Sequence, residues 1–198
     1  MRPTIAPPGT VTSGSRTYTD FVNESGMAGA TTTSTPSADS AATLEGGSFV
    51  KLCDGVAAFG TSFRCNDEAA GALREVLARI GWELVVVPLP GYTIHLDMHL
   101  AMLDVDLALA DVGGLPYTFL TRLGAMGIDL VHAEPGEVWG LNLLALGPRR
   151  VLMAEGSPVT TARLRDAGVE VRTVAYDEIH RNGGGVHCST MELVRNPA

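Results

Sequence analysis

A stretch of similar sequence recurs along this chain at intervals of nearly 50 residues. Its copies begin at Glu45, His95, Asn142 and Cys188, with separations of 50, 47 and 46 residues. A repeat of this length is typical of radial or stacked architectures in which each copy is one supersecondary unit. We therefore expect the opening residues of successive units to lie near a common axis.

The first copy shows what a unit contains. Two apolar runs, residues 48–52 and 56–59, flank Asp54-Gly55, a dipeptide that favours a β-hairpin. A helix is predicted next, with Asn66 as its N-cap and Gly81 after its end. Its apolar face is predicted to be Ala69, Leu73, Val76, Leu77 and Ile80. The apolar run 84–87 then predicts a buried strand, which completes a strand–strand–helix–strand unit.

Two more units follow the same pattern, so the predicted fold class is α/β. The second runs from His95 through strands at 107–109 and 128–131, with a helix near 115–126 between them. The third has strands at 143–146, 151–153 and 169–174, a Gly147-Pro148 turn and a helix near 158–167. A fourth unit begins at Cys188 and stops almost at once.

Four motifs stand at or near the heads of these units. They are Leu44-Glu45-Gly46-Gly47, His95-Leu96-Asp97, the segment 139–142 and the run from Asn182 to Thr190, which contains Gly-Gly-x-His-Cys. This ordered set closely resembles the guanidine-modifying superfamily of arginine deiminases, dimethylarginine dimethylaminohydrolases, agmatine deiminases and glycine amidinotransferases. The resemblance covers roughly residues 43–197. It implies a partial pentein-type propeller of about three units plus the start of a fourth, with the active site on the axis.

The resemblance also implies roles for particular residues. Cys188 would be the nucleophile, His95 the general acid and base, and Glu45 the third catalytic group. Asp97 would bind the substrate guanidinium together with Glu45, because carboxylates pair with that planar cation through charge-assisted hydrogen bonds. Arg64 and Arg181 resemble arginines that hold a substrate carboxylate. The alternative is that both are solvated surface arginines with no role in binding. Asn142 is expected to be structural support, and no cofactor or metal is implied.

Other interpretations of these residues stay open at this point. A free cysteine is most often a small buried side chain. Cys53 and Cys65 belong to no motif, so neither is expected to be catalytic. His95, Asp97 and His99 are spaced as on one face of a strand, which with Glu45 is also compatible with a metal site.

The motifs leave three functions open. A cysteine-dependent amidinohydrolase would convert a guanidino compound into a ureido product, and an amidinotransferase would pass the amidino group to an amine. Hydrolysis is preferred, because it needs no second specific pocket. The third hypothesis is a catalytically incomplete family member that serves as a partner or has no function.

Composition sets the remaining expectations. The 198 residues are 45% hydrophobic, with a formal charge of −8 and a pI near 5.0, which argues against nucleic-acid binding. No apolar run has the length of a membrane span and the three cysteines do not form a disulfide framework, so a soluble, cytoplasmic protein is expected.

Two domains are predicted, and the second is incomplete. Residues 1–42 are rich in Thr, Ser, Pro, Ala and Gly and are predicted to be disordered, and 43–198 form the partial propeller domain. The resemblance implies about two further units before Glu45 that this chain does not show. A homo-oligomer or a complementary N-terminal chain would be needed to close the axis.

Overall fold

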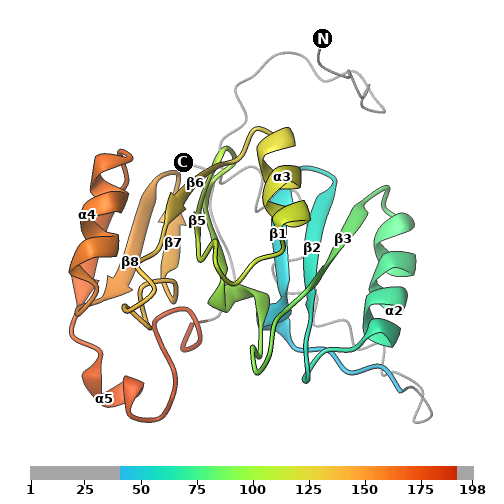
Figure 1. The fold of residues 1–198 in the computed structure, drawn as a ribbon, viewed down its shortest axis with the longest axis horizontal. Helices are drawn as coiled ribbons and strands as arrows, with labels where there is room; N and C mark the ends of the chain where they lie inside the picture. The colour runs from blue at the N-terminus through green and yellow to red at the C-terminus, as the bar shows by residue number, and fades with distance from the viewer. Residues whose placement is uncertain (1–40, 191–198) are drawn as a thin grey trace.

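The computed structural model describes residues 41–190, and within them three strand–strand–helix–strand units follow one another (Figure 1). The first unit contains β1 (Phe49–Cys53), β2 (Val56–Thr61), α2 (Asp67–Ala78) and β3 (Glu83–Pro88). The second contains β4 (Leu100–Asp104), β5 (Leu107–Ala110), α3 (Tyr117–Ala125) and β6 (Asp129–His132). The third contains β7 (Leu144–Gly147), β8 (Arg150–Ala154), α4 (Pro158–Asp166) and β9 (Glu170–Val174). A short helix, α5 (Asp177–His180), comes last.

The three sheets share one topology. In each, the first strand pairs antiparallel with the second, and the third returns through the helix to pair parallel with the second. The predicted Asp54-Gly55 hairpin is confirmed, because Cys53 pairs with Val56 and Gly55 has a positive φ of 75°. The predicted α/β class is therefore correct. The segment predicted to be disordered lies outside the described residues, apart from its last two.

Helix α2 begins as the sequence predicts, and its predicted apolar face packs inward apart from Val76 and Ile80. The side chain of Asn66 accepts a hydrogen bond from the backbone N–H of Ala69 at 3.1 Å. Ala69, Ala70 and Leu77 are buried, whereas Val76 and Ile80 are 46% and 55% exposed. The helix ends at Ala78, so Ile80 lies in the turn beyond it and helical spacing no longer decides its position.

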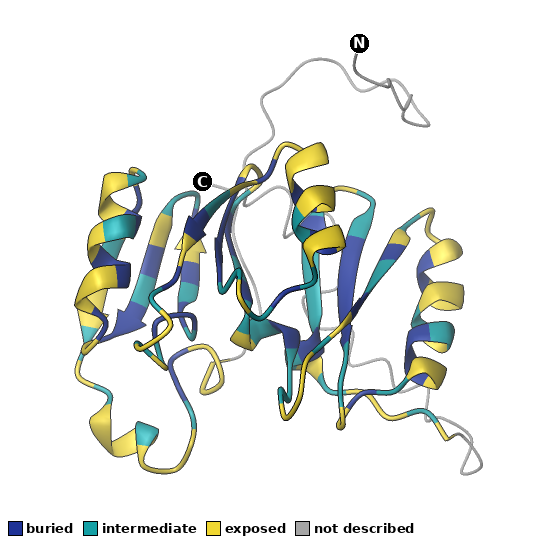
Figure 2. Ribbon diagram, viewed as in Figure 1, coloured by how far each residue is buried: buried dark blue, intermediate teal, exposed yellow. Residues whose placement is uncertain are grey.

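Neighbouring units share their apolar cores. One cluster joins the first and second units and includes Leu52, Val87, Leu100, Phe119 and Leu123; another joins the second and third and includes Leu103, Leu109, Leu143, Val151 and Met153. Figure 2 shows buried residues concentrated on the strands and exposed residues on the outward faces of the helices. The units therefore pack as a continuous row.

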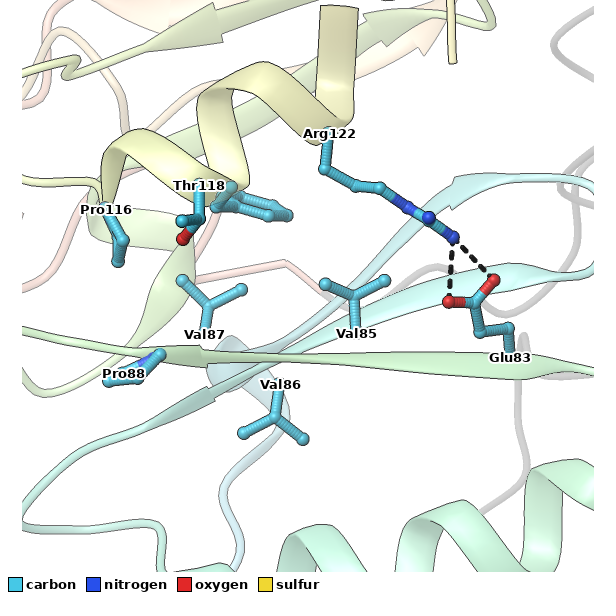
Figure 3. A pocket seen from close by; sticks show the side chains of 9 residues that line it. Glu83, Val85, Val86, Val87, Pro88, Pro116, Thr118 and Arg122 are labelled. Carbon is cyan, nitrogen blue, oxygen red and sulfur yellow. Dashed lines mark hydrogen bonds and ion pairs between the residues drawn. The ribbon is translucent and has the colours of Figure 1, made fainter. Parts of the chain in front are cut away.

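Helix α3 of the second unit lies over β3 of the first (Figure 3). Val85 and Val87 point toward α3, and Val86 points to the opposite face, as successive residues of a strand must. Arg122 on α3 donates to both carboxylate oxygens of Glu83 on β3, at 2.7 and 2.8 Å. The hollow beside this ion pair measures about 290 Å³ and is lined by both apolar and polar side chains. This contact joins the first two units.

The first two units open in the same way. Glu45 and His95 have extended backbones, and each precedes a single turn of 3-10 helix, η1 (Gly46–Ser48) and η2 (Leu96–Met98). The predicted strand at His95 to His99 is therefore wrong, because residues 96–98 turn before β4 begins. Among the described residues, no helix is long and apolar enough to cross a membrane.

A carboxylate from a preceding loop caps helix α4. Glu137 accepts hydrogen bonds from the backbone N–H groups of Val159 and Thr160, at 2.7 and 2.8 Å. Burial raises the pKa of Glu137, but the hydrogen bonds from Thr160 and Val159 outweigh it, so the net pKa is lowered. The capping residue Ser157 makes no such bond itself. Glu137 therefore ties the loop leading to Asn142 to the third unit.

We predict that Glu137→Ala lowers the free energy of unfolding by about 1 kcal/mol at pH 7, the usual cost of a lost helix cap. Because the folded-state pKa of Glu137 is lowered, its contribution is present above the ordinary glutamate pKa of about 4.3 and is lost as the pH falls through the folded value. Urea unfolding of wild type and variant at several pH values measures this. Glu155→Ala, an exposed glutamate next to α4, is the matched control. A difference that is absent at pH 7 or unchanged in acid would contradict the prediction.

Candidate active site

The heads of the first two units meet through Glu45 and His95. Nε2 of His95 donates a hydrogen bond to Oε2 of Glu45. The hydrogen bond from His95, followed by that from Arg64, lowers the pKa of Glu45 below its usual value. Glu45 is therefore the ionised partner, and Nε2 of His95 carries the proton.

Gly47 makes this approach possible. A Cβ at position 47 would lie 2.7 Å from Nδ1 of His95 and 2.8 Å from Oδ2 of Asp97, closer than real Cβ atoms approach. A side chain here would also fill the space in front of His95 and Asp97. The second glycine of the Glu-Gly-Gly motif is thus explained by close packing of η1 against η2.

Asp97 lies between two histidines. Its Oδ1 is 3.9 Å from Nδ1 of His95, and its Oδ2 is 3.2 Å from Nδ1 of His187. The Asp97 side chain is 14% exposed, which makes it the most enclosed acid of this group. His187 was not predicted as a site residue, although its place directly before the predicted nucleophile was a usable signal.

Arg64 contacts Glu45. Its Nε and Nη2 donate to Oε1 of Glu45 at 2.8 and 2.6 Å. Both oxygens of Glu45 are thus engaged, one by Arg64 and one by His95. In this structure Glu45 and Arg64 pair with each other, and the binding of a substrate guanidinium by Glu45 and of a substrate carboxylate by Arg64 stays a prediction.

Cys188 lies on an exposed turn that Asn142 holds in place. Nδ2 of Asn142 donates to the Cys188 sulfur at 2.9 Å, and Oδ1 accepts from the backbone N–H groups of His187 and Cys188 at 2.8 and 3.4 Å. A Cβ at Gly185 would lie 2.3 Å from Oδ1 of Asn142. The last glycine of the motif therefore allows the close contact with Asn142. The contact of His187 with Asp97 joins this turn to the acidic group.

Two other predicted residues point elsewhere. Arg181, which directly follows α5, pairs with Glu178 at 2.8 Å, and its side chain is 70% exposed. His99 donates to Asp111 and accepts from Thr93, both at 2.9 Å, so it does not join His95 and Asp97. Within residues 41–190, no group of three or more His, Cys, Asp or Glu side chains is placed to hold a metal ion. The metal hypothesis has no geometric support in this part of the chain.

The other two cysteines have different surroundings. Burial raises the pKa of the Cys53 thiol, which disfavours the reactive thiolate. Cys65 is fully buried, and its sulfur accepts the backbone N–H of Glu45 at 3.3 Å. Cys65 thus helps to position Glu45 and is closed to solvent.

Comparison with known proteins adds independent findings. A family model described as arginine deiminase matches residues 122–195. An arginine deiminase of Mycobacterium bovis (strain BCG / Pasteur 1173P2) is 30% identical over 191 residues, covering 79% of this chain and 48% of that protein. A solved structure of a cysteine-to-serine mutant of DDAH from Pseudomonas aeruginosa, complexed with citrulline, has a TM-score of 0.62 and 25% identity, covering 76% of this chain and 56% of the other. The chain belongs to the guanidine-modifying superfamily.

Two further similar proteins widen the comparison. A 2-nitroimidazole nitrohydrolase of Mycobacterium sp. (strain JS330) is 31% identical over 111 residues, covering 54% of this chain and 29% of that protein. An amidinotransferase, SxtG from Microseira wollei, shares the fold with a TM-score of 0.66, over 77% of this chain and 48% of the other. The chain spans about half the length of the curated arginine deiminases that it matches.

The site geometry predicts which thiol reacts first. We expect iodoacetamide to alkylate Cys188 well before Cys53, whose pKa is raised by burial, and Cys65, which is enclosed. Peptide mass spectrometry of briefly treated native protein measures the order, and urea-unfolded protein, in which all three should react, is the control. Faster labelling of Cys53 in the native protein would contradict the assignment.

Proposed function

We propose that this chain is a cysteine-dependent amidinohydrolase that converts a guanidino compound into a ureido product through an amidino group bound to Cys188. The observation that carries the proposal is the continuous set of contacts from Glu45 through His95 and Asp97 to His187, which directly precedes Cys188. Membership of the superfamily supports the reaction class. Arginine and its derivatives are the proposed substrate class.

Asp97 is the proposed anchor for the guanidinium. It is the least exposed acid of the group, and neither of its oxygens is within 3 Å of a histidine nitrogen. A guanidinium can therefore compete for both oxygens through paired hydrogen bonds. Glu45 takes the different role of holding His95 in one orientation, since both of its oxygens are occupied.

In the first step, the Cys188 thiolate attacks the guanidinium carbon and forms a C–S bond. The C–N bond to the leaving nitrogen then breaks, and that nitrogen takes the electron pair and a proton from His95. In this step His95 acts as an imidazolium: Nε2 keeps the proton that it donates to Glu45, and Nδ1, which faces Asp97, gives its own proton to the leaving nitrogen. Ammonia or an amine leaves, and an amidino-thioether remains on Cys188.

In the second step, water replaces the leaving amine. His95 takes a proton from water as the oxygen attacks the amidino carbon, and the C–S bond breaks with its electron pair returning to Cys188. The hydroxyl group then loses its remaining proton to solvent, and the product is a urea. If an amine entered in place of water, the same residues would give amidino transfer, so product analysis separates the two reactions.

The three units are proposed to be consecutive blades of a pentein-type propeller. Support comes from the shared cores between successive units and from their common opening at Glu45 and His95. Because the chain spans about half the length of the relatives it matches, ring closure calls for further units. We propose that a second copy or a complementary N-terminal chain supplies them, and that an isolated monomer is weakly active.

We predict that Cys188→Ser and His95→Ala each abolish conversion of guanidino compounds, whereas Cys53→Ser and Cys65→Ser leave it largely unchanged. The reason is that the first two remove the nucleophile and the proton donor of both steps. The measurement is product identification by mass spectrometry, with a panel of guanidino compounds in the presence and absence of amine acceptors. Ureido product made by Cys188→Ser would refute the hydrolase proposal, and transferred amidine made by wild type would select the transferase.

Asn142→Asp tests whether Asn142 only holds the turn or also stabilises the Cys188 sulfur through its N–H group. The variant keeps an oxygen for the His187 and Cys188 N–H groups but replaces the N–H donor to the sulfur with a negative charge. Loss of a hydrogen bond to a charged group costs about 1.5–3 kcal/mol, or roughly ten- to hundredfold in rate. We expect kcat to fall by this factor with little change in melting temperature and with slower alkylation of Cys188. An unchanged alkylation rate across pH would show that Asn142 only holds the turn.

A further inference from the structure

The backbone that leads into His95 is held by hydrogen bonds from two directions. Thr93 lies two residues before His95, and its hydroxyl oxygen is 2.9 Å from Nε2 of His99. The carbonyl of Ile94, the residue between them, accepts a hydrogen bond from the hydroxyl of Ser62 at 2.7 Å. The chain before His95 is therefore fixed by one contact within its own loop and by one contact from the first unit.

His99 closes this segment into a loop. Its backbone N–H donates to the carbonyl three residues earlier, at 2.9 Å, which ends η2, and its side chain reaches back to Thr93. Residues 93–99 thus form a loop that is closed on itself and contains both His95 and Asp97. Closing the loop removes backbone freedom that would otherwise let these two side chains separate.

Asp111, directly after β5, holds His99 in turn. Its Oδ2 accepts a hydrogen bond from Nδ1 of His99 at 2.9 Å, and its backbone N–H donates to the carbonyl of His99 at 2.9 Å. Its Oδ1 accepts from the backbone N–H of Gly113 at 3.2 Å. Because Nδ1 of His99 carries the proton, Nε2 is the acceptor for the hydroxyl of Thr93.

This network is closely packed. A Cβ at Gly114 would lie 2.1 Å from Nδ1 of His99 and 2.6 Å from Oδ2 of Asp111, so only a glycine fits there. The side chain of His99 is 13% exposed. Water therefore does not readily replace a hydrogen bond that is removed from His99, and the loss is passed on to the loop.

We propose that Thr93 and His99 are positioning residues for proton transfer by His95. This inference rests on the proposed function, in which Nδ1 of His95 gives a proton to the leaving nitrogen. Glu45 holds Nε2 of His95, and the bond between Thr93 and His99 holds the backbone, so the two contacts together keep Nδ1 toward Asp97. Thr93 and His99 act through His95 and do not bind the substrate.

The first step of the reaction offers a readout that is specific for this role. A departing nitrogen must take up a proton, whereas an alkylthiolate can leave without one. The probes are arginine, a methylarginine and agmatine, each paired with the S-methylisothiourea that has a methylthio group in place of the departing nitrogen. Release of ammonia or methylamine, or of methanethiol, in a single turnover with protein in excess follows the first step alone.

We expect Thr93→Val, which removes the hydroxyl but keeps the shape, to slow release of ammonia or methylamine about tenfold at saturating substrate. The half-saturating concentration and the rate of methanethiol release should each change less than about twofold, because neither depends on the proton of His95. Thr93→Ser, which keeps the hydroxyl, should behave as wild type. Thr121→Val is the matched control, since it removes an exposed hydroxyl on α3 that donates to the carbonyl of Thr118.

His99→Asn repeats the test from the other side of the same hydrogen bond. Asparagine keeps an N–H group near the position of Nδ1 for Asp111 but does not reach Thr93. It should slow release of the nitrogen leaving group by the same factor. The double variant Thr93→Val/His99→Asn should be no slower than either single variant, because all three lack one and the same contact.

The outcomes distinguish this inference from the proposed function. Equal slowing of nitrogen and methanethiol release in Thr93→Val, unchanged nitrogen release, or a Thr93→Ser variant as slow as Thr93→Val would each overturn the inference and leave the amidinohydrolase proposal in place. If Thr93→Val does not fold, the same comparison in His99→Asn decides, and failure of both to fold would show that the contact supports the fold and not the reaction. If wild type released ammonia or methylamine from none of the three guanidino compounds, the proposed function would fall and the inference with it.

Discussion

The absence of a side chain at Gly47 is the constraint on which the site depends. Only because η1 can press against η2 at this position does Glu45 reach His95 from the neighbouring unit and hold it beside Asp97. The same contact leaves space in front of Nδ1 of His95, where a substrate nitrogen bound to Asp97 would exchange its proton. The packing of the first two units against each other therefore also sets the orientation of His95, the proposed acid–base group.

A second glycine allows a similarly close contact between the third unit and the turn that follows it. Gly185 permits the backbone to approach Asn142 closely, and Asn142 then bonds two N–H groups of the turn and the sulfur of Cys188. The contact between His187 and Asp97 links this turn to the second unit. Glu137 reinforces the arrangement by fastening the loop before Asn142 to helix α4. Glu45 and His95, which open the first two units, thus hold each other across the boundary between those units. Asn142, which opens the third unit, holds the turn that carries Cys188.

Local patterns in the sequence predicted the local structure well. The Asp54-Gly55 hairpin, the Asn66 cap and the three strand–strand–helix–strand units all follow from short-range rules, and the repeat spacing brought Glu45 and His95 together in the prediction. Interactions between distant segments could not be predicted in this way. The pairing of Arg64 with Glu45 spans 19 residues and the cap from Glu137 spans 22, and neither has a sequence signature. The 3-10 turn at 96–98 also separates His99 from His95 and Asp97, because side chains two residues apart share a face only in an extended strand.

The proposed reaction requires Cys188 to carry the amidino group between its two steps. The most direct measurement is rapid acid quenching of the protein during turnover of a guanidino substrate, followed by peptide mass spectrometry of the three cysteines. We expect an amidino adduct on the peptide containing Cys188, formed and lost at the rate of product release, with Cys53 and Cys65 unmodified. Product formation with no adduct at any time, or an adduct on Cys53 or Cys65, would contradict it.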